Sequence, residues 1–119
     1  MKNKPLQQIN DEIQSIKSQL QDLGDMRPGS LTQQYRNPKQ QSGAFYQISY
    51  THNMKSKTEY VRPQFVKDIR QQIRNYKKFK KLIEKWVALA IQYSQLSMKE
   101  QIERAELHQV TKTKHRRRG

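Results

Sequence analysis

Residues 66–90 read VKDIRQQIRNYKKFKKLIEKWVALA, and this stretch decides most of the fold. No glycine or proline occurs from Gln64 to Arg118, and Pro63 suits the first turn of a helix. The pattern predicts a long amphipathic helix over residues 63–107. At about 1.5 Å per residue it would be roughly 65 Å long, too long to be buried in one small domain. It therefore either projects or breaks near residues 92–99.

Cations and apolar side chains separate cleanly on this predicted helix. With 100° between successive residues, seven basic side chains share a stripe about 100° wide and about 27 Å long. Only Asp68 and Glu84 bring negative charge to this part, so most of these cations lack an intrahelical partner. Clustered unpaired cations repel one another, which favours contact with a polyanion; a merely solvated face is the alternative. The basic stripe consists of Lys67, Arg70, Arg74, Lys77, Lys78, Lys81 and Lys85.

An apolar seam lies opposite the basic stripe, with spacing 3, 4, 3, 4, 3 over residues 76–93. Residues 6–23 repeat this spacing and predict a coiled-coil-like helix over residues 1–25. Two complementary seams favour packing of this helix on the long one. A homodimer or a protein partner through the heptads is the alternative. Trp86 lies within the seam and is interpreted as a core residue rather than a base-stacking one.

Residues 26–62, between the helices, predict a small antiparallel sheet. Residues 44–51 are the clearest strand, and residues 57–62 would pair with them as a hairpin. Residues 31–36 could add a third strand and complete a meander. The fold class is therefore α+β, with Gly24 as a plausible left-handed cap between the first helix and the sheet.

The two faces of the predicted sheet differ in chemistry. Tyr46, Ile48 and Tyr50 alternate onto one face, which we expect to pack on the long helix. The other face is polar, and a twisted ribbon can read base edges in the major groove of B-DNA. A polar outer face is also typical of any one-sided sheet. Its candidate contact residues are Gln47, Ser49 and, depending on the register of the hairpin, Lys57.

The formal net charge of +14 is unevenly distributed. Residues 1–29 carry as many acidic as basic side chains, so the positive field belongs to the rest of the chain, as expected of a nucleic-acid binder. Residues 108–119 show no periodicity and predict a disordered basic tail. The tail would add phosphate contacts through Arg116, Arg117 and Arg118.

Several functional classes find no support in the sequence. There is no cysteine, no glycine-rich phosphate loop and no local pairing of a carboxylate with one of the three histidines. We therefore expect no enzyme, metal site, cofactor or small-molecule substrate. The chain also lacks a long apolar run and an N-terminal signal pattern, so we expect no membrane partner and a cytoplasmic protein, nucleoid-associated if it binds DNA.

Three short motifs resemble an uncharacterised prokaryotic domain family. They are RPGSL at residues 27–31, GAFYQISY at residues 43–50 and KTEYV at residues 57–61, followed by a basic helix. The resemblance covers residues 26–85, and members of that family are often encoded beside transposases. Their cysteine-rich loop has no counterpart in residues 37–43, which contain no cysteine. The order of strand, hairpin and helix also looks like the small DNA-binding domains of some tyrosine recombinases.

Charge pattern and resemblance together predict a DNA-binding accessory or regulatory protein of a mobile genetic element. A component that binds RNA within a ribonucleoprotein is the nearest alternative, because the same cations stand near aromatic residues. A helical adaptor for an acidic protein partner is the second alternative.

Overall fold

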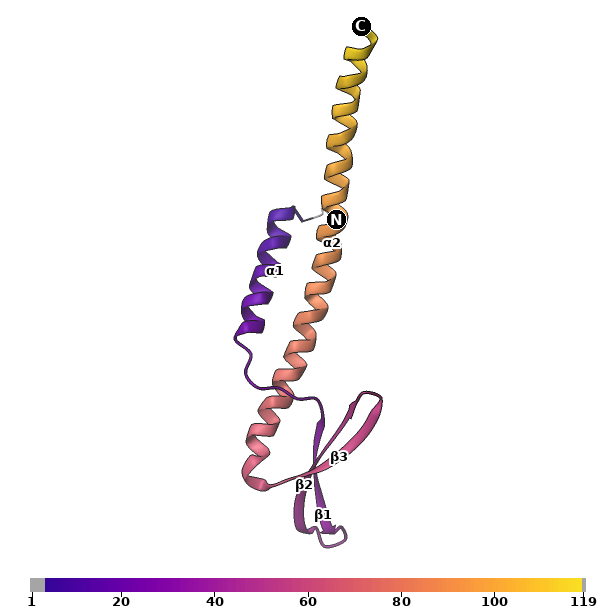
Figure 1. The fold of residues 1–119 in the computed structure, drawn as a ribbon. Helices are drawn as coiled ribbons and strands as arrows, with labels where there is room; N and C mark the ends of the chain where they lie inside the picture. Colours follow the sequence, from indigo (N-terminus) through magenta and orange to yellow (C-terminus); the bar gives the residue numbers. More distant parts are fainter. Residues whose placement is uncertain (1–3, 119) are drawn as a thin grey trace. The chain divides into compact units, whose positions relative to one another are not determined.

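The computed structural model describes the backbone of residues 4–118 and the side chains of residues 4–108. The chain is α+β, and a three-stranded antiparallel meander separates two helices in the sequence (Figure 1). Two compact units are distinguished: a helical unit, Met1–Gln19 with Ile83–Gly119, and a sheet unit, Leu20–Leu82. The elements in chain order are α1 (Leu6–Gln21), β1 (Ser30–Asn37), β2 (Ser42–His52), β3 (Lys55–Val61), the short 3-10 helix η1 (Pro63–Phe65) and α2 (Val66–Arg118).

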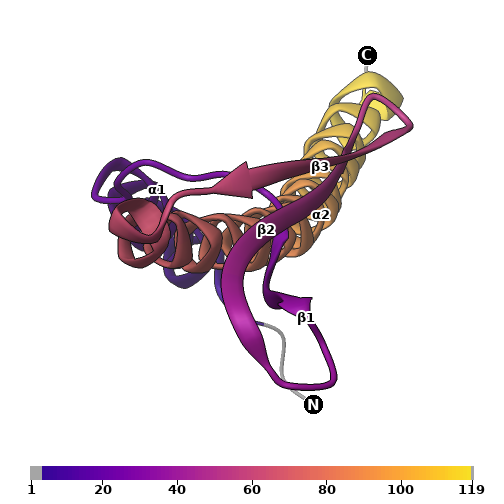
Figure 2. The same ribbon diagram turned by 90° about the horizontal axis from the view of Figure 1, so that it is seen from below.

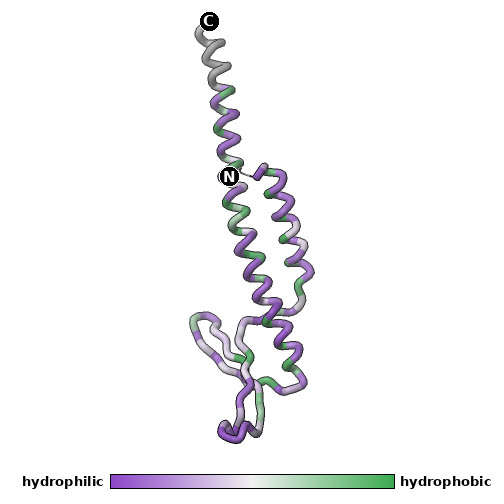
Figure 3. The backbone as a smooth tube through the Cα atoms, turned by 180° about the vertical axis from the view of Figure 1, so that it is seen from behind, coloured by the Kyte–Doolittle hydropathy of each residue, from purple (hydrophilic) through white to green (hydrophobic). Residues whose placement is uncertain are grey.

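In the helical unit, α1 lies alongside the part of α2 that starts at Ile83 (Figures 1 and 3). The isoleucine stripe of α1 is buried: Ile9, Ile13 and Ile16 are 0%, 8% and 5% exposed. Lys17 Nζ lies 5.3 Å from the centre of the Trp86 ring. The predicted packing of the first helix on the long helix is therefore what this unit shows.

The seam on α2 is shifted from the predicted one. Ala90 and Tyr93 were expected to be covered, but both are exposed. Leu89 and Leu96 are half-buried instead, as is Trp86. The difference follows from helix geometry, because 3.6 residues per turn drift away from a 3.5-residue repeat as the helix advances.

The end of α1 also differs from the prediction. The helix ends at Gln21, and Gly24 is not among the residues with positive φ, so Gly24 is not a left-handed cap. Within the sheet unit, the connection is held on α2 by Asn75, whose Nδ2 donates to the carbonyl oxygen of Asp25 at 2.8 Å. The connection after α1 is thus fixed at Asp25 by a tertiary hydrogen bond.

The sheet has the strand order β1-β2-β3 with antiparallel pairing throughout, so the three-stranded meander is confirmed (Figure 2). The loop between β2 and β3 contains only Asn53 and Met54, with φ of 51° and 63°. Two successive residues with positive φ define a type I′ turn, whose twist matches that of the strands. The tight turn determines the register, which pairs Ile48 with Glu59 and Tyr50 with Lys57.

This register corrects the placement of Lys57. Residues directly opposite one another in a sheet share a face, so Lys57 lies on the face of Tyr50 and Ile48. Lys57 was an outer-face candidate beside Gln47 and Ser49 for one register of the hairpin, and the observed register is the other one. The alternation within each strand was not enough to decide, since a shift of one residue exchanges the two faces.

The core of the sheet unit lies between the inner face of the sheet and the first turns of α2. Ile48 is fully buried and is surrounded by Val61, Val66 and Ile73. The predicted inner face of β2 is thus confirmed for Ile48. Three partly buried side chains complete the cluster, namely Leu31, Tyr46 and Ile69.

Helix α2 runs for 53 residues without a break at residues 92–99, so the continuous alternative is the one observed. The tail predicted for residues 108–119 lies, from residue 109 onward, outside the described side chains and stays a prediction. Within the described residues, no helix is both long enough and apolar enough to cross a bilayer.

Candidate nucleic-acid interface

The basic stripe of α2 is present as predicted, and all seven of its side chains are exposed. Among the residues that the structure describes, the ion pairs are Lys4 with Glu12 at 2.9 Å and Arg27 with Glu59 at 3.6 Å. None of the seven stripe cations is therefore neutralised by a described carboxylate. The stripe keeps its charge available for an external anion.

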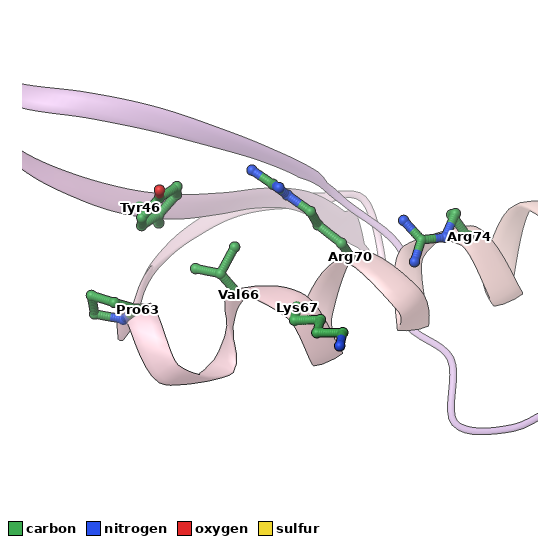
Figure 4. A pocket seen from close by; sticks show the side chains of 6 residues that line it. All are labelled: Tyr46, Pro63, Val66, Lys67, Arg70 and Arg74. Carbon is green, nitrogen blue, oxygen red and sulfur yellow. The ribbon is translucent and has the colours of Figure 1, made fainter.

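Part of the stripe faces the sheet across a groove of about 410 Å³ (Figure 4). Tyr46 of β2 lies on one side, and Arg70 and Arg74 of α2 lie on the other. The remaining lining residues are Pro63, Val66 and Lys67. A planar aromatic ring and two guanidinium groups thus border the same open space.

Two further grooves continue along the same helix. One of about 350 Å³ shares Arg70 and Arg74 and adds Lys77, which faces residues 29–31. The next, of about 400 Å³, shares Lys77 and adds Lys80 and residues 49–51 of β2. Because neighbouring grooves share residues, we describe the three together as the basic groove. Its cations are Lys67, Arg70, Arg74, Lys77 and Lys80.

The wall opposite α2 is positioned by backbone contacts. The backbone N–H of Arg27 donates to the carbonyl oxygen of Gln72 at 3.2 Å, which ties the segment before β1 to the helix. Gly29 then lies so close to the core that a Cβ atom there would be 2.7 Å from Ile48 Cγ1. Only glycine allows this approach, and it brings Ser30 against the groove.

A charged cluster stabilises the same segment from the sheet. The guanidinium of Arg27 stacks 4.9 Å from the Tyr50 ring centre, and Tyr50 Oη donates to Glu59 Oε1 at 2.6 Å. This hydrogen bond, together with the nearby Arg27 charge, lowers the pKa of the Glu59 carboxyl below its ordinary value. The same hydrogen bond raises the pKa of the Tyr50 hydroxyl. The only carboxylate of the sheet is therefore occupied internally and stays ionised.

The other predicted contact residues are placed as follows. Lys78 and Lys81 are exposed cations of α2 in the sheet unit, whereas Lys85 belongs to the helical unit. Gln47 is half-buried between Thr32 and Tyr60, its partners in the flanking strands. The hydroxyl of Ser49 forms a hydrogen bond with that of Thr58 at 3.2 Å, and Ser49 also lines the third groove. Lys57 lies on the inner face of the sheet. Arg116, Arg117 and Arg118 lie outside the described side chains.

Three groove residues were not predicted from the sequence: Ser30, which lines two of the three grooves, Tyr46 and Lys80. Tyr46 was interpreted only as a core residue, although it is partly buried and its ring borders the groove. Lys80 falls outside the stripe, but its Nζ lies 5.7 Å from the Tyr76 ring centre and it lines the third groove. A signal for Tyr46 was present, since tyrosine combines an apolar body with a polar tip and is enriched at interfaces.

The fold and the groove define an α+β protein whose helix carries a cationic surface against a small sheet. The chain belongs to the family described as Domain of unknown function (DUF6788), whose model matches residues 6–71. The match covers α1, the complete sheet and the start of α2. The match confirms that the chain contains an uncharacterised domain, as the resemblance implied. The matched region begins and ends earlier than the predicted residues 26–85. No curated protein and no solved structure matches the chain.

Proposed function

We propose that this protein binds nucleic acid through the basic groove, without catalysing a reaction on it. The observation that carries the proposal is the lining: five cations of α2 follow one another along the groove, and none of its lining residues is acidic. Holding unpaired cations together costs free energy through their mutual repulsion, and an anion relieves this cost. A solvated face would not need cations gathered against a second wall.

The dimensions suit a phosphate backbone. Lys67 and Lys80 are 13 residues apart on α2, about 20 Å at ~1.5 Å per residue. One strand of DNA presents about six phosphates over this length. Arg70 and Arg74 would hold phosphate oxygens through their planar guanidinium forks, and Ser30 would add a hydroxyl donor.

Duplex DNA is the favoured ligand, and the favoured role is that of an accessory or regulatory protein of a mobile genetic element. The support for both is the resemblance of residues 26–85 to domains encoded beside transposases. Base reading would fall to the outer face of the sheet, through Gln47 and Ser49.

RNA is the second candidate, and the position of Tyr46 supports it. An accessible aromatic ring beside Arg70 and Arg74 is an arrangement on which an unpaired base can stack. An adaptor role toward an acidic protein would use the same cations and is treated as an outcome of the experiments below.

The proposal is tested by titrating duplex DNA at several salt concentrations with two charge-matched variants. R70Q/R74Q removes two groove cations, and K17Q/R104Q removes two cations of the helical unit. We expect R70Q/R74Q to lower the slope of log affinity against log salt by about 2, since each phosphate contact contributes roughly 0.9. The K17Q/R104Q slope should stay close to that of the native protein. An equal decrease of this slope in both variants would mean that net charge, and not the groove, governs binding.

Competition among duplex DNA, structured RNA and single-stranded RNA separates the two ligands. If RNA is the ligand, Tyr46→Leu should weaken single-strand binding by about 1–3 kcal/mol, the contribution of one stacked base, and leave duplex binding unchanged. A preference for RNA over duplex DNA would overturn the DNA proposal. Absence of nucleic-acid binding, with stable capture of an acidic protein by the same cations, would support the adaptor.

A further inference from the structure

The β2–β3 hairpin continues beyond the three-stranded part of the sheet. The last pair between β1 and β2 joins Ser30 with Ser49, whereas β2 stays paired with β3 as far as their turn. Residues 50–57 therefore form a two-stranded ribbon, whose loop ends away from the other elements of the sheet unit (Figure 1). Every residue from 51 to 60 is exposed. The end of the ribbon is thus a projection that takes no part in the core.

Met54, at the tip of this ribbon, combines an exposed apolar side chain with an unfavourable backbone. The side chain is 98% exposed, and its φ of 63° lies in the left-handed region, where glycine and asparagine are the usual turn residues. A single exposed apolar residue is ordinary on a protein surface. Among the described non-glycine residues with positive φ, however, Met54 is the apolar one, since the others are Gln41 and Asn53. A strained residue that folding does not use is the kind of outlier that indicates a contact outside the chain.

The charge around the tip is positive. No acidic residue occurs from residue 26 to residue 58. Lys55 and Lys57 follow the tip on β3, and neither belongs to an ion pair of the described residues. Glu59, the next carboxylate on β3, is paired with Arg27. The ribbon therefore presents two cations directly beside one apolar side chain.

Duplex DNA matches this combination, because its phosphates are anionic and its stacked bases are apolar. An acidic protein would satisfy the two lysines, but a stable protein interface buries about 800 Å² on each partner, far more than one methionine offers. A narrow ribbon with an apolar tip instead fits a gap between two base pairs. Methionine is among the side chains with which architectural proteins unstack such a step.

The ribbon is also continuous with the basic groove. Thr51 of the ribbon lines the third groove together with Lys77 and Lys80. Met54 follows three residues later, which is about 10 Å along a strand at roughly 3.3 Å per residue. A duplex whose backbone follows the cations of α2 would therefore pass within reach of the tip.

We infer that Met54 wedges between two base pairs of the bound duplex, unstacks that step and bends the DNA, while Lys55 and Lys57 contact the adjacent phosphates. The inference rests on the proposed binding of duplex DNA and adds a deformation of the ligand to it. Unstacking costs free energy, and the bend offsets this cost by bringing more phosphates into the basic groove. The protein would thus prefer DNA that is easily unstacked, without reading its bases.

The first test compares the affinities of the full chain for two duplexes of equal length, one fully paired and one with a central mismatch that is easier to unstack. We expect the native chain to prefer the mismatched duplex on the order of tenfold. Met54→Gly should bring this ratio close to 1, although it relieves the backbone and keeps the fold. Met54→Leu retains an apolar wedge and should keep the preference. Gln41→Gly, the matched control, makes the same backbone change in the β1–β2 loop and should behave as the native chain.

The second test measures bending by energy transfer between dyes at the two ends of a duplex of about 30 base pairs, at saturating protein. The native chain, Met54→Leu and Gln41→Gly should raise the transfer, and Met54→Gly should return it to the value of free DNA. The inference is overturned if the native chain binds the duplex without raising the transfer, or if Met54→Gly bends it as the native chain does. Absence of duplex binding by the native chain would instead refute the proposed function and this inference with it, so the two failures are distinguishable.

Discussion

The two segments of α2 differ in what surrounds them and in charge. Residues 66–82 belong to the sheet unit, where Val66 and Ile73 enter the core and the adjacent side carries the cations of the groove. Residues 83–107 belong to the helical unit, where α1 covers one side and leaves exposed an apolar stripe of Val87, Ile91, Met98 and Ile102. One continuous helix thus carries exposed cations in one segment and an exposed apolar stripe in the next. The four predictions below test whether these segments act separately.

The largest effect is expected from truncating the most buried residue of each unit. Ile48 and Ile9 are both 0% exposed, so Ile48→Ala and Ile9→Ala should each lower the free energy of unfolding by about 2–5 kcal/mol. Ile48→Ala should also weaken nucleic-acid binding, because Ile48 supports Gly29 in the groove wall. Ile9→Ala should leave binding intact. Denaturant unfolding followed by circular dichroism and by Trp86 fluorescence, which reports only on the helical unit, separates the two.

A single methyl group at Gly29 should disturb the groove wall. Gly29→Ala places Cβ 2.7 Å from Ile48 Cγ1 at a φ of 142°, so we expect a loss of about 1–3 kcal/mol in the free energy of unfolding. Gly24→Ala is the control, since its Cβ would lie 3.4 Å from Asn75 Nδ2, an ordinary contact. Equal stability of the two variants in thermal unfolding would contradict the close packing at Gly29.

A glycine substitution in the β2–β3 turn should stabilise the sheet unit. Met54 has a φ of 63° and is 98% exposed, so its backbone is strained and its side chain contributes nothing to the core. Met54→Gly should raise the free energy of unfolding of the sheet unit by about 1 kcal/mol. Asn53→Gly should give less, because asparagine tolerates a left-handed conformation. Hydrogen exchange of the hairpin amides measures both, and faster exchange in the Met54→Gly variant would argue against a type I′ turn.

The smallest effect concerns the Arg27–Tyr50–Glu59 cluster and pH. Because the folded-state pKa of Glu59 is lowered from 4.5, its contribution to stability is fully present above that value and is lost as pH falls through the lowered pKa. Glu59→Gln should therefore destabilise the protein slightly at neutral pH, and the difference from the native chain should shrink on acidification. Exposed pairs contribute little, so the change is expected to be small. Unfolding curves from neutral to acidic pH check the sign; a difference that grows toward acid would contradict it.

Periodicity predicted the secondary structure well because each element has a long or regular pattern. The isoleucines of α1, the alternation around Ile48 and the unbroken run after Pro63 gave the helices, strands and their order. Positions that depend on packing between elements were less predictable. Ala90 was expected to be covered and is exposed. Gly24 was expected to be a left-handed cap but has no positive φ, and the connection that follows is instead held at Asp25 by a hydrogen bond from Asn75.

The candidate site was predictable in part for the same reason. The stripe containing Arg70, Arg74 and Lys77 follows from helical spacing alone. Its second wall does not, because Tyr46 and Ser30 reach the cations only through the twist of the sheet and the path of the chain before β1. Lys57 shows the limit most clearly, since its face depends on a two-residue turn and not on its own strand.

The sequence by itself determined the α+β class, the order of the elements and the separation of charge from apolar residues on α2, because these depend on spacing along the chain. Only the tertiary structure decided which side chains share a groove, which face Lys57 occupies and which apolar stripe α1 leaves exposed. Those features depend on the register of the strands, on the close approach of Gly29 to Ile48 and on the side of α2 that each neighbour covers. All three are contacts between elements, and a local sequence pattern does not encode such contacts.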